Sequence, residues 1–270
     1  DVVFTALPNG EAQEISKILL PKNTLIDLAA DFRLEKASDY LKWYKQKHKA
    51  TKQIDKSIYL LPELNKYDLR KYKIIACPGC YPTSILLPLY PLIKKGVIDT
   101  NNIIIDSKSG YSGAGKNLKK NFKHKNLYSA IHPYGILNHR HLGEIDQELF
   151  KASNSQVNYV FTPHLIPTFR GLLSAIYVEK KNNVTLKKIH KELLYFHKKN
   201  FFIRVAKIDK NIGTENVINN NFCEISVCQL KFKNKVLILS AIDNLIKGAG
   251  GQAIQNMNLI FGFKENLGLK

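Results

Sequence analysis

The order of apolar and amphipathic segments predicts an α/β fold for the first part of the chain. Residues 1–10, DVVFTALPNG, have the pattern of a buried strand that ends in a Pro-Asn-Gly turn. Residues 11–22 follow as a helix, residues 24–34 as a second strand, and residues 71–78 as a further strand. Strands that alternate with helices favour a mainly parallel sheet. Such sheets bind ligands beyond the carboxyl ends of their strands.

The pattern changes after residue 80, where strands dominate. Helical spacing of apolar residues recurs at 185–199 and in the closing segment 251–263, which is expected to return and pack on the first domain. A strand followed by a Ser/Gly loop is predicted at 102–116, and five further strand-like segments lie at 155–165, 171–181, 201–208, 222–232 and 235–243. The sequence therefore predicts an α+β block inserted into an α/β domain.

Composition narrows the class of protein. Charge is strongly basic, with 41 Lys+Arg against 22 Asp+Glu and a net charge of +19. The basic residues are nearly all lysines, densest at 116–125, and they accompany abundant Asn and Ile, as AT-rich coding produces. The sequence shows no visible cluster of the arginines and stacking aromatic residues that nucleic-acid-binding proteins use. The longest apolar run, 84–93, is too short to span a bilayer. With no export signal, a cytoplasmic protein is expected, and neither nucleic acid nor membrane is expected as a partner.

The four cysteines, at 77, 80, 223 and 228, are expected to be reduced thiols in that compartment. A four-cysteine zinc site is disfavoured, because Cys223 and Cys228 lie on a predicted strand and point to opposite faces. No metal site is therefore predicted. Cys77 and Cys80 remain open to three interpretations: a redox pair, two small core residues, or one nucleophile with a neighbour.

Cys80 is the strongest candidate for covalent chemistry. It follows a strand and Gly79, and it precedes a segment with helical spacing that has Pro82 in its first turn and Gly96 at its far end. Backbone N–H groups and the helix dipole at such a terminus stabilise a thiolate and the oxyanion that it forms on a carbonyl. The local pattern predicts a nucleophile.

A nucleophilic cysteine needs a base, and LNHRHLGEIDQEL at 137–149 is the segment richest in histidine. If the helix begins near His141, Glu144 lies one turn further and can orient the imidazole. A metal site and surface histidines are the rival interpretations. Anion-binding candidates are Arg33 after the second strand, the Ser/Gly-rich segment 107–116, and His164 with Arg170.

Together these motifs resemble the N-acetyl-gamma-glutamyl-phosphate reductases of arginine biosynthesis. The matching stretches occur in the family's order over nearly all of the chain and include DVVFTALPNG, IDLAADFRL, YLKWYKQKH, PGCYPTSILLPLYPLI, DSKSGYSGAGK, HRHLGEI, FTPHLIPTFRGLLSAIYV and DNLIKGAGGQAIQNMNLIFGF. Aspartate-semialdehyde dehydrogenase is a more distant relative with the same reaction type, and a lysine-pathway reductase is nearer.

The resemblance implies a Rossmann domain that binds NADP and an inserted catalytic and dimerisation domain. The expected boundaries are 1–79 with 246–270 for the first and 80–245 for the second. The family's Gly-rich phosphate loop lies upstream of DVVF, so the chain resembles the family without its first β-α-β units, and weak NADP binding is expected. One departure is Cys77, where the family usually has Asn.

The resemblance also implies residue roles. Cys80 attacks the acyl phosphate, His141 is the acid–base group, and Glu144 stands behind it. Substrate contacts are expected from His139 and His164, and from Arg33 and Arg170, which are candidates for the phosphate and the α-carboxylate in no assigned order. The residues expected near the nicotinamide half of NADP are Pro8, Asn9, Gly10, Ser109, Gly110, Asn244 and Gly248.

The predicted function is NADPH-dependent reduction of N-acetyl-L-glutamyl 5-phosphate to the semialdehyde by a homodimer or homotetramer. Two alternatives from other classes stay open: a basic nucleic-acid-binding protein, and a thiol oxidoreductase that uses Cys77 and Cys80.

Overall fold

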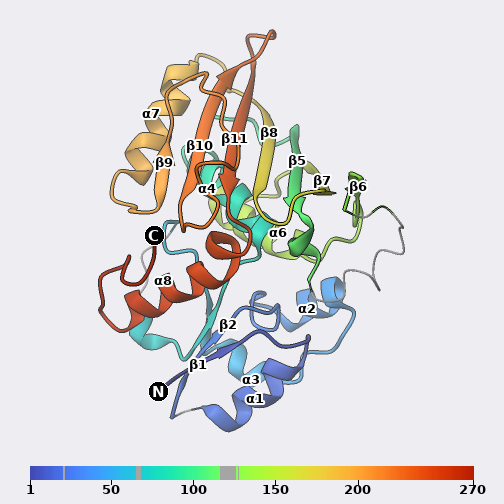
Figure 1. Ribbon diagram of the computed structural model, residues 1–270, viewed down its shortest axis with the longest axis vertical. Helices are drawn as coiled ribbons and strands as arrows, with labels where there is room; N and C mark the ends of the chain where they lie inside the picture. The colour runs from blue at the N-terminus through green and yellow to red at the C-terminus, as the bar shows by residue number, and fades with distance from the viewer. Residues whose placement is uncertain (21, 65–67, 116–125, 127) are drawn as a thin grey trace.

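The computed structural model describes residues 1–20, 22–64, 68–115, 126 and 128–270. Two sheets lie at opposite ends of the molecule, and helix α8 (Gly251–Ile260) crosses between them (Figure 1). The lysine-rich segment 116–125 lies outside the described residues. Within the described part of the chain, every helix is too short or too polar to span a bilayer.

The smaller sheet is parallel throughout, with the strand order β1-β2-β4-β3. Its strands are β1 (Val2–Thr5), β2 (Thr24–Asp27), β3 (Ser57–Tyr59) and β4 (Ile74–Ala76). The helical segments around it are α1 (Glu11–Leu19), α2 (Ala37–Tyr44), α3 (Thr51–Ile54) and a 3₁₀ turn at Leu69–Lys71.

The predicted strands are present but shorter. The segment 24–34 pairs only as far as Asp27, and its remainder is a loop that carries Asp31 and Arg33. The expectation of a buried first strand is wrong for β1, in which Phe4 is 43% exposed. Among the described strands β1 is at the edge of the sheet, so one side of it lacks the cover that β2 and β4 receive.

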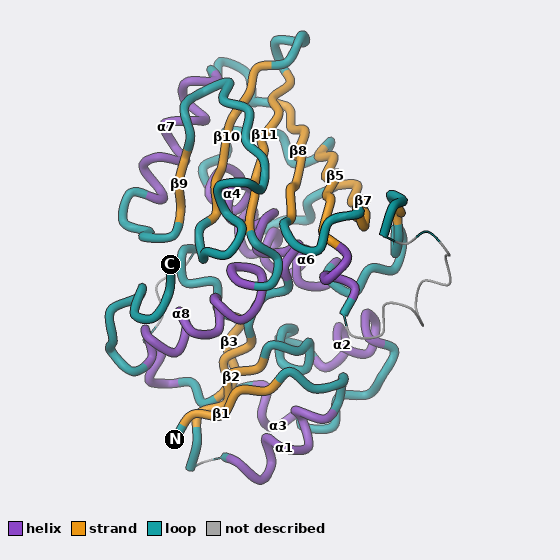
Figure 2. The backbone as a smooth tube through the Cα atoms, viewed as in Figure 1, coloured by secondary structure: helices purple, strands orange, loops and turns teal. Residues whose placement is uncertain are grey.

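The larger sheet is mixed and has the order β6-β7-β5-β8-β11-β10-β9 (Figure 2). Its strands are β5 (Ile103–Gly110), β6 (His132–Pro133), β7 (Tyr159–Ile166), β8 (Leu172–Glu179), β9 (Ile203–Val205), β10 (Cys223–Gln229) and β11 (Lys235–Ile242). Its helical segments are α4 (Cys80–Lys94), α6 (Leu142–Ser153), α7 (Leu186–His197), a 3₁₀ turn at Tyr111–Ala114 and a π-turn, η3, at Ile246–Gly250.

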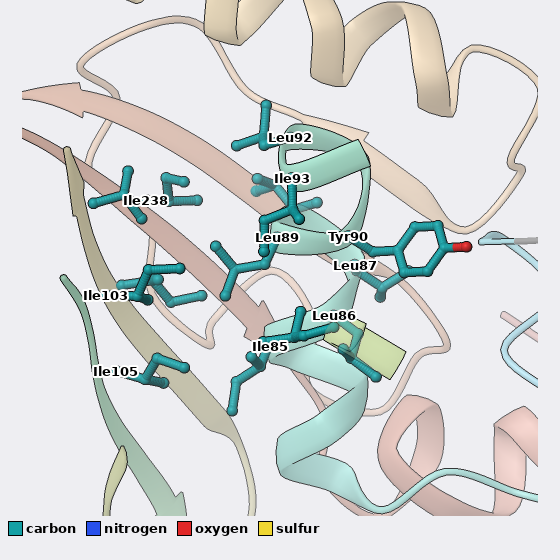
Figure 3. Close-up of a cluster of buried hydrophobic side chains, with 14 of the residues drawn as sticks. Ile85, Leu86, Leu87, Leu89, Tyr90, Leu92, Ile93, Ile103, Ile105 and Ile238 are labelled. Carbon is teal, nitrogen blue, oxygen red and sulfur yellow. The ribbon is translucent and has the colours of Figure 1, made fainter. Parts of the chain in front are cut away.

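One face of the larger sheet carries the main core. Strand β8 alternates strictly between buried and half-buried residues, so one face is apolar and covered. Helix α4 packs on that face, where Ile85 and Leu89 lie near Ile103, Ile105 and Ile238 (Figure 3). Helices α6 and α7 contribute to the same core. The other face stays open, and Ile104 and Val160 on it are exposed.

Helix α4 differs from the one-sided helix that its spacing predicts. All residues from Tyr81 to Ile93 are buried, because the larger sheet, α6 and α7 surround it. The predicted return of the closing helix is confirmed, since Ala253 of α8 packs with Ile26 and Ile75 of the smaller sheet. The observed architecture confirms the predicted fold class, a Rossmann-type parallel sheet with an α+β block.

Candidate active site

Cys80 is the first residue of α4, directly after the turn that leaves β4. The turn residue Gly79 has no room for a side chain, because a Cβ there would lie 2.4 Å from Nε2 of His141. The Gly79 amide donates a 2.9 Å hydrogen bond to Oε2 of Glu144. The cysteine, the histidine and the carboxylate that the sequence singled out therefore meet at one helix N-terminus.

Glu144 is the fully buried centre of this cluster. Besides the Gly79 amide, it accepts a hydrogen bond from Arg33 Nη1 at 2.9 Å and one from the Tyr59 hydroxyl at 3.1 Å. Its Oε1 lies 3.9 Å from Nε2 of His141. A buried carboxylate requires such donors. Glu144 thus holds the turn before the cysteine, and its carboxylate lies next to the His141 imidazole.

Arg33 joins the same cluster to the smaller sheet. Its Nε donates to the Cys77 carbonyl and its Nη2 to the Leu28 carbonyl, both at 2.8 Å, while Nη1 binds Glu144. Each guanidinium nitrogen therefore has a protein acceptor, and the side chain is buried. This geometry favours a positioning role for Arg33 between the ends of β2 and β4, and the predicted substrate contact stays a prediction.

The two histidines are buried and stacked edge to face, with ring centroids 4.7 Å apart. Burial, with the neighbouring His139, Arg33 and Arg140, holds the pKa of His141 well below its usual value. Burial also lowers the pKa of His139 to about 3. Both imidazoles are therefore neutral at physiological pH, the form in which a histidine accepts a proton.

The thiol of Cys80 differs from the sequence expectation. Burial raises its pKa to about 11, which outweighs the lowering by the Tyr81 amide and by Arg33 and Arg140. The stabilising effect that the sequence predicts for the helix N-terminus is present in the Tyr81 amide, but burial favours the neutral thiol more strongly. A neutral thiol beside neutral His141 requires a proton transfer when the sulfur attacks.

The opposite side of Cys80 is formed by the π-turn η3. A Cβ on Gly248 would lie 2.6 Å from the Cβ of Cys80, so only glycine lets the backbone approach this closely. The structure thus places Gly248, one of the predicted cofactor residues, directly against Cys80.

Ser109, Gly110 and Asn244 form a second cluster at the ends of β5, β8 and β11. The Gly110 amide donates to the Gly171 carbonyl and the Gly171 amide to Asn244 Oδ1, both at 2.8 Å. The Ser109 hydroxyl donates to the Gly110 carbonyl at 3.1 Å. Strand β5 runs through Gly110, so the predicted phosphate-wrapping loop at 107–116 is corrected: residues 107–110 belong to the sheet.

Arg170 lies beside this cluster, on the turn between β7 and β8. Its Nη1 binds Asp243 Oδ2 at 3.2 Å and Asn219 Oδ1 at 2.5 Å, and its side chain is 27% exposed. A Cβ on Gly110 would lie 2.7 Å from the Arg170 amide. The guanidinium is therefore anchored at one nitrogen and partly accessible.

The Pro8–Gly10 turn follows β1. Gly10 has a left-handed backbone with φ of 93°, and its amide donates a 2.7 Å hydrogen bond to Asp31 Oδ1. Because β1, β2 and β4 are parallel, this turn lies at the same edge of the smaller sheet as the turn that leads to Cys80. Asn9 lies between the other two predicted cofactor residues on this turn.

His164 is not brought to the site. It alternates with Phe161 and Leu165, which are buried on the α4 side, so it points to the open face of the larger sheet. There its Nδ1 lies 3.2 Å from Asp106 Oδ1. The register of β7 thus directs the ring away from Cys80, which does not favour the predicted substrate contact through this side chain.

Cys77 is buried on the α8 side of the smaller sheet, and burial raises its pKa to about 12. Asn256 Nδ2 lies 3.7 Å from its sulfur. All four cysteines are free thiols. Cys223 and Cys228 are both buried, with Ser240 and Ser226 as neighbours. The described residues contain no group of three or more His, Cys, Asp or Glu side chains suited to a metal ion.

Several residues of the site were not predicted from the sequence. Tyr59 has no motif around it and is recognised only through its bond to Glu144. Asp31 and Lys247 stand within the quoted stretches IDLAADFRL and DNLIKGAGG, but nothing in either stretch shows that both side chains are buried.

Comparison with known proteins places the chain and its fold in a family. Residues 1–72 match the semialdehyde dehydrogenase NAD binding domain, and residues 80–244 match the semialdehyde dehydrogenase dimerisation domain. Aspartate semialdehyde dehydrogenase II from Vibrio cholerae has a similar fold, with a TM-score of 0.67 at 17% identity over 97% of this chain and 79% of that one.

Two curated relatives are closer in sequence. N-acetyl-gamma-glutamyl-phosphate reductase from Clostridium botulinum (strain Alaska E43 / Type E3) is 46% identical over all of this chain and 78% of its own length. A probable chloroplastic N-acetyl-gamma-glutamyl-phosphate reductase from Arabidopsis thaliana is 42% identical, with 67% of its length covered. The chain therefore belongs to the N-acetyl-gamma-glutamyl-phosphate reductase family, a branch of the semialdehyde dehydrogenases, as its motifs predicted.

Proposed function

We propose that the protein reduces N-acetyl-L-glutamyl 5-phosphate to N-acetyl-L-glutamate 5-semialdehyde and phosphate, with NADPH as the reductant. The observation that carries this proposal is the cluster at the start of α4, where Cys80 follows a turn held by Glu144 and covered by His141. The names of the relatives supply the acyl group and the place in arginine biosynthesis. A lysine-pathway reductase and aspartate-semialdehyde dehydrogenase are the alternatives within the same chemistry.

The first half of the reaction needs only residues of this chain. The Cys80 sulfur forms a bond to the acyl carbon, the bond from that carbon to the phosphate oxygen breaks, and phosphate leaves. The thiol proton passes to neutral His141. Backbone N–H groups at the start of α4 stabilise the negative charge that develops on the acyl oxygen. The result is a thioester on Cys80.

NADPH, when bound, supplies the hydride for the second half. A fit is supported by two backbone features: the left-handed Gly10 at the carboxyl edge of the parallel sheet, and Gly248, where any side chain would collide with Cys80. The residues that would hold the nicotinamide half are Pro8, Asn9, Gly10, Ser109, Gly110, Asn244 and Gly248. When Cys80 departs as a thiol, the His141 imidazolium returns its proton to the sulfur.

Arg170 is the candidate for binding an anionic group of the substrate. It is partly exposed beside Gly110, whereas the nitrogens of Arg33 are engaged by the protein. His139 forms part of the wall next to His141 and Tyr81. Substrate specificity therefore depends on Arg170 more than on Arg33.

A homodimer is the proposed assembly, formed through the open face of the larger sheet. Ile104 and Val160 are exposed on that face, and the matching domain is described as a dimerisation domain. A homotetramer and a cytoplasmic location remain predictions.

The proposed function is tested with Cys80→Ser in the full-length protein. The variant is expected to lose turnover by at least about 10³-fold because the nucleophile is gone. Mass spectrometry of the parent protein, incubated with the acyl phosphate and no NADPH, should detect an acyl group on Cys80. The matched control is Cys228→Ser, a buried thiol on β10. Turnover by the folded Cys80→Ser variant at the parental rate would refute the mechanism.

A further inference from the structure

The described part of the chain holds a second buried ion pair, which the proposed reaction does not use. Lys247 lies in η3 and Glu63 in the segment between β3 and β4, and both side chains are at most 1% exposed. The Lys247 ammonium donates to Oε1 of Glu63 and, at 2.7 Å, to Oε1 of Gln255 on α8. Gln255 Nε2 donates to the same Glu63 oxygen at 2.8 Å. The three side chains form a closed ring.

This ring is attached to the wall of the nucleophile. Lys247 is the residue before Gly248, whose backbone packs on Cys80 so closely that a Cβ would lie 2.6 Å from the Cβ of Cys80 and 3.0 Å from its Cα. The Gly248 amide donates to the Asp243 carbonyl at 3.0 Å, within a π-turn. Such turns are rare and occur frequently at functional sites.

Stability alone gives no reason for this ring. A buried ion pair costs its desolvation, and well-packed apolar residues of similar volume often serve equally well. The second Glu63 oxygen, Oε2, is buried and has no hydrogen-bond partner among the described residues. What the ring does supply is a single geometry, because its three hydrogen bonds form together in one arrangement. Here that geometry sets the position of η3 relative to α8 and to the Glu63 segment.

Direct electrostatics on the thiol come from elsewhere. The cations that lower the pKa of Cys80 are Arg33 and Arg140. The Lys247 charge is directed to Glu63 and lies 5.7 Å from the centroid of the Phe202 ring. An influence of Lys247 on Cys80 therefore runs through the position of the backbone at Gly248.

We propose that Lys247 is a positioning residue for the nucleophile: with Glu63 and Gln255 it fixes the π-turn so that Gly248 restricts the Cys80 side chain to one orientation. This proposal rests on the proposed role of Cys80. Loss of the ring would free η3, widen the space around the sulfur and let Cys80 adopt orientations that are unproductive for attack.

The test is the double variant Lys247→Met/Glu63→Gln in the full-length protein. It removes both charges together, so no unpaired charge is left buried, and each replacement is similar in size. The single variant Lys247→Met leaves Glu63 unpaired and serves to measure the cost to folding. Ile189→Val in α7, a core change remote from η3, is the control for general destabilisation.

Two readouts separate positioning from a merely structural role. At a temperature where the double variant is folded, kcat is expected to fall about 10- to 100-fold, as small misplacements of reacting groups do, while KM changes little. Alkylation of Cys80 by iodoacetamide, followed by mass spectrometry, is expected to become several-fold faster, because the wall beside the sulfur has loosened. Ile189→Val should change neither.

The alkylation rate requires no reductase activity, so it tests the wall even if the proposed reaction is wrong. A folded double variant with parental kcat and parental alkylation would overturn the proposal. Faster alkylation with unchanged kcat would show that the orientation of Cys80 does not limit the reaction, and a loss of kcat with unchanged alkylation would show that the effect bypasses Cys80. Both results reject the proposal as stated.

Discussion

Two buried ion pairs flank Cys80, and they differ in what surrounds them. On one side Arg33 and Glu144 hold the Gly79 turn and lie next to His141. On the other side Lys247 and Glu63 hold the π-turn and are closed by the amide of Gln255. The Glu144 carboxylate of the first pair lies 3.9 Å from the His141 imidazole, whereas the Glu63 carboxylate of the second accepts hydrogen bonds from the Lys247 ammonium and the Gln255 amide.

The difference suggests separate roles for the two ion pairs beside Cys80. Glu144 contacts the backbone before Cys80 and lies next to the imidazole that would receive the thiol proton in the proposed reaction, so a change there is expected to alter both geometry and proton transfer. Lys247 touches neither the sulfur nor the imidazole in any contact of the described residues, so a change there alters geometry alone. The comparison thus predicts effects of different size and kind from chemically similar substitutions.

The largest effect is expected from Glu144→Gln. The substitution leaves buried Arg33 without its counter-charge and removes the anion near His141, so kcat should fall by about 10²- to 10⁴-fold, the range of general acid–base catalysis. The free energy of unfolding should fall by about 3–5 kcal/mol, as when a buried pair loses one partner. Steady-state kinetics and denaturant unfolding measure the two losses.

Glu63→Gln is the matched control for that prediction, because it makes the same change in the other ion pair. It should lower the free energy of unfolding to a similar extent but reduce kcat, per folded molecule, far less than Glu144→Gln. Equal losses of kcat in the two variants would erase the distinction between the pairs.

The sequence predicted the first pair in part and the second not at all. The motif HRHLGEI placed His141 and Glu144 one turn apart, which is a local relation, and the helix begins where that spacing requires. The contacts of Arg33 and Tyr59 with Glu144 span long stretches of chain and arise only from packing of the two sheets. Lys247, Glu63 and Gln255 carry no local pattern, since a buried lysine looks like a surface lysine in a chain so rich in that residue.

The strands show the same division between local patterns, which the sequence displays, and tertiary contacts, which it does not. The alternation along β7 and β8 is visible in the sequence, so their existence was predictable. Which face His164 would occupy depended on register against β5, which is set by tertiary pairing. The raised pKa of Cys80 likewise depends on burial in the folded chain, where Gly248 of η3 packs against it, and local spacing does not report this.

A smaller effect is expected from His197, which lies near the Lys247–Glu63 pair and makes the free energy of unfolding depend on pH. His197 Nε2 contacts the Leu87 carbonyl at 2.9 Å, and its Nδ1 lies 2.9 Å from Asn200 Nδ2, which also donates to the Glu63 carbonyl. Burial lowers the pKa of His197 to about 4. The neutral ring is thus favoured in the folded state, and its contribution is complete above the unfolded pKa of about 6.5 and is lost as the pH falls toward 4.

His197→Gln measures this contribution. The variant should have a lower free energy of unfolding than the parent at pH 7.5. By linkage, that deficit should shrink by about 2 kcal/mol at pH 5. At pH 5 the unfolded parent protonates His197, whereas the folded parent keeps it neutral, so the parent loses stability that the variant never had. Urea unfolding at the two pH values checks the difference. Leu193→Ala, a cavity in the same helix without a titratable group, should cost the same at both, and a constant deficit for His197→Gln would contradict the prediction.

The smallest effect is expected at Cys77, whose carbonyl accepts a hydrogen bond from Arg33. The family usually has Asn at this position, and here the buried sulfur lies 3.7 Å from Asn256 Nδ2. An Asn side chain would be similar in size and could accept the hydrogen bond from Asn256. Cys77→Asn should therefore leave kcat within about twofold and unfolding within about 1 kcal/mol, as volume-conserving changes do.

The same substitution decides between nucleophile and redox pair. A disulfide enzyme that uses Cys77 and Cys80 would lose all thiol–disulfide exchange in Cys77→Asn, because a single sulfur cannot cycle between dithiol and disulfide. The reductase mechanism uses one sulfur and should survive, with the added property that mild oxidants no longer convert Cys80 into an internal disulfide. Incubation with oxidised glutathione, followed by a reductase assay and mass spectrometry, distinguishes the two mechanisms. Loss of turnover in the unoxidised Cys77→Asn variant would support the redox pair of Cys77 and Cys80.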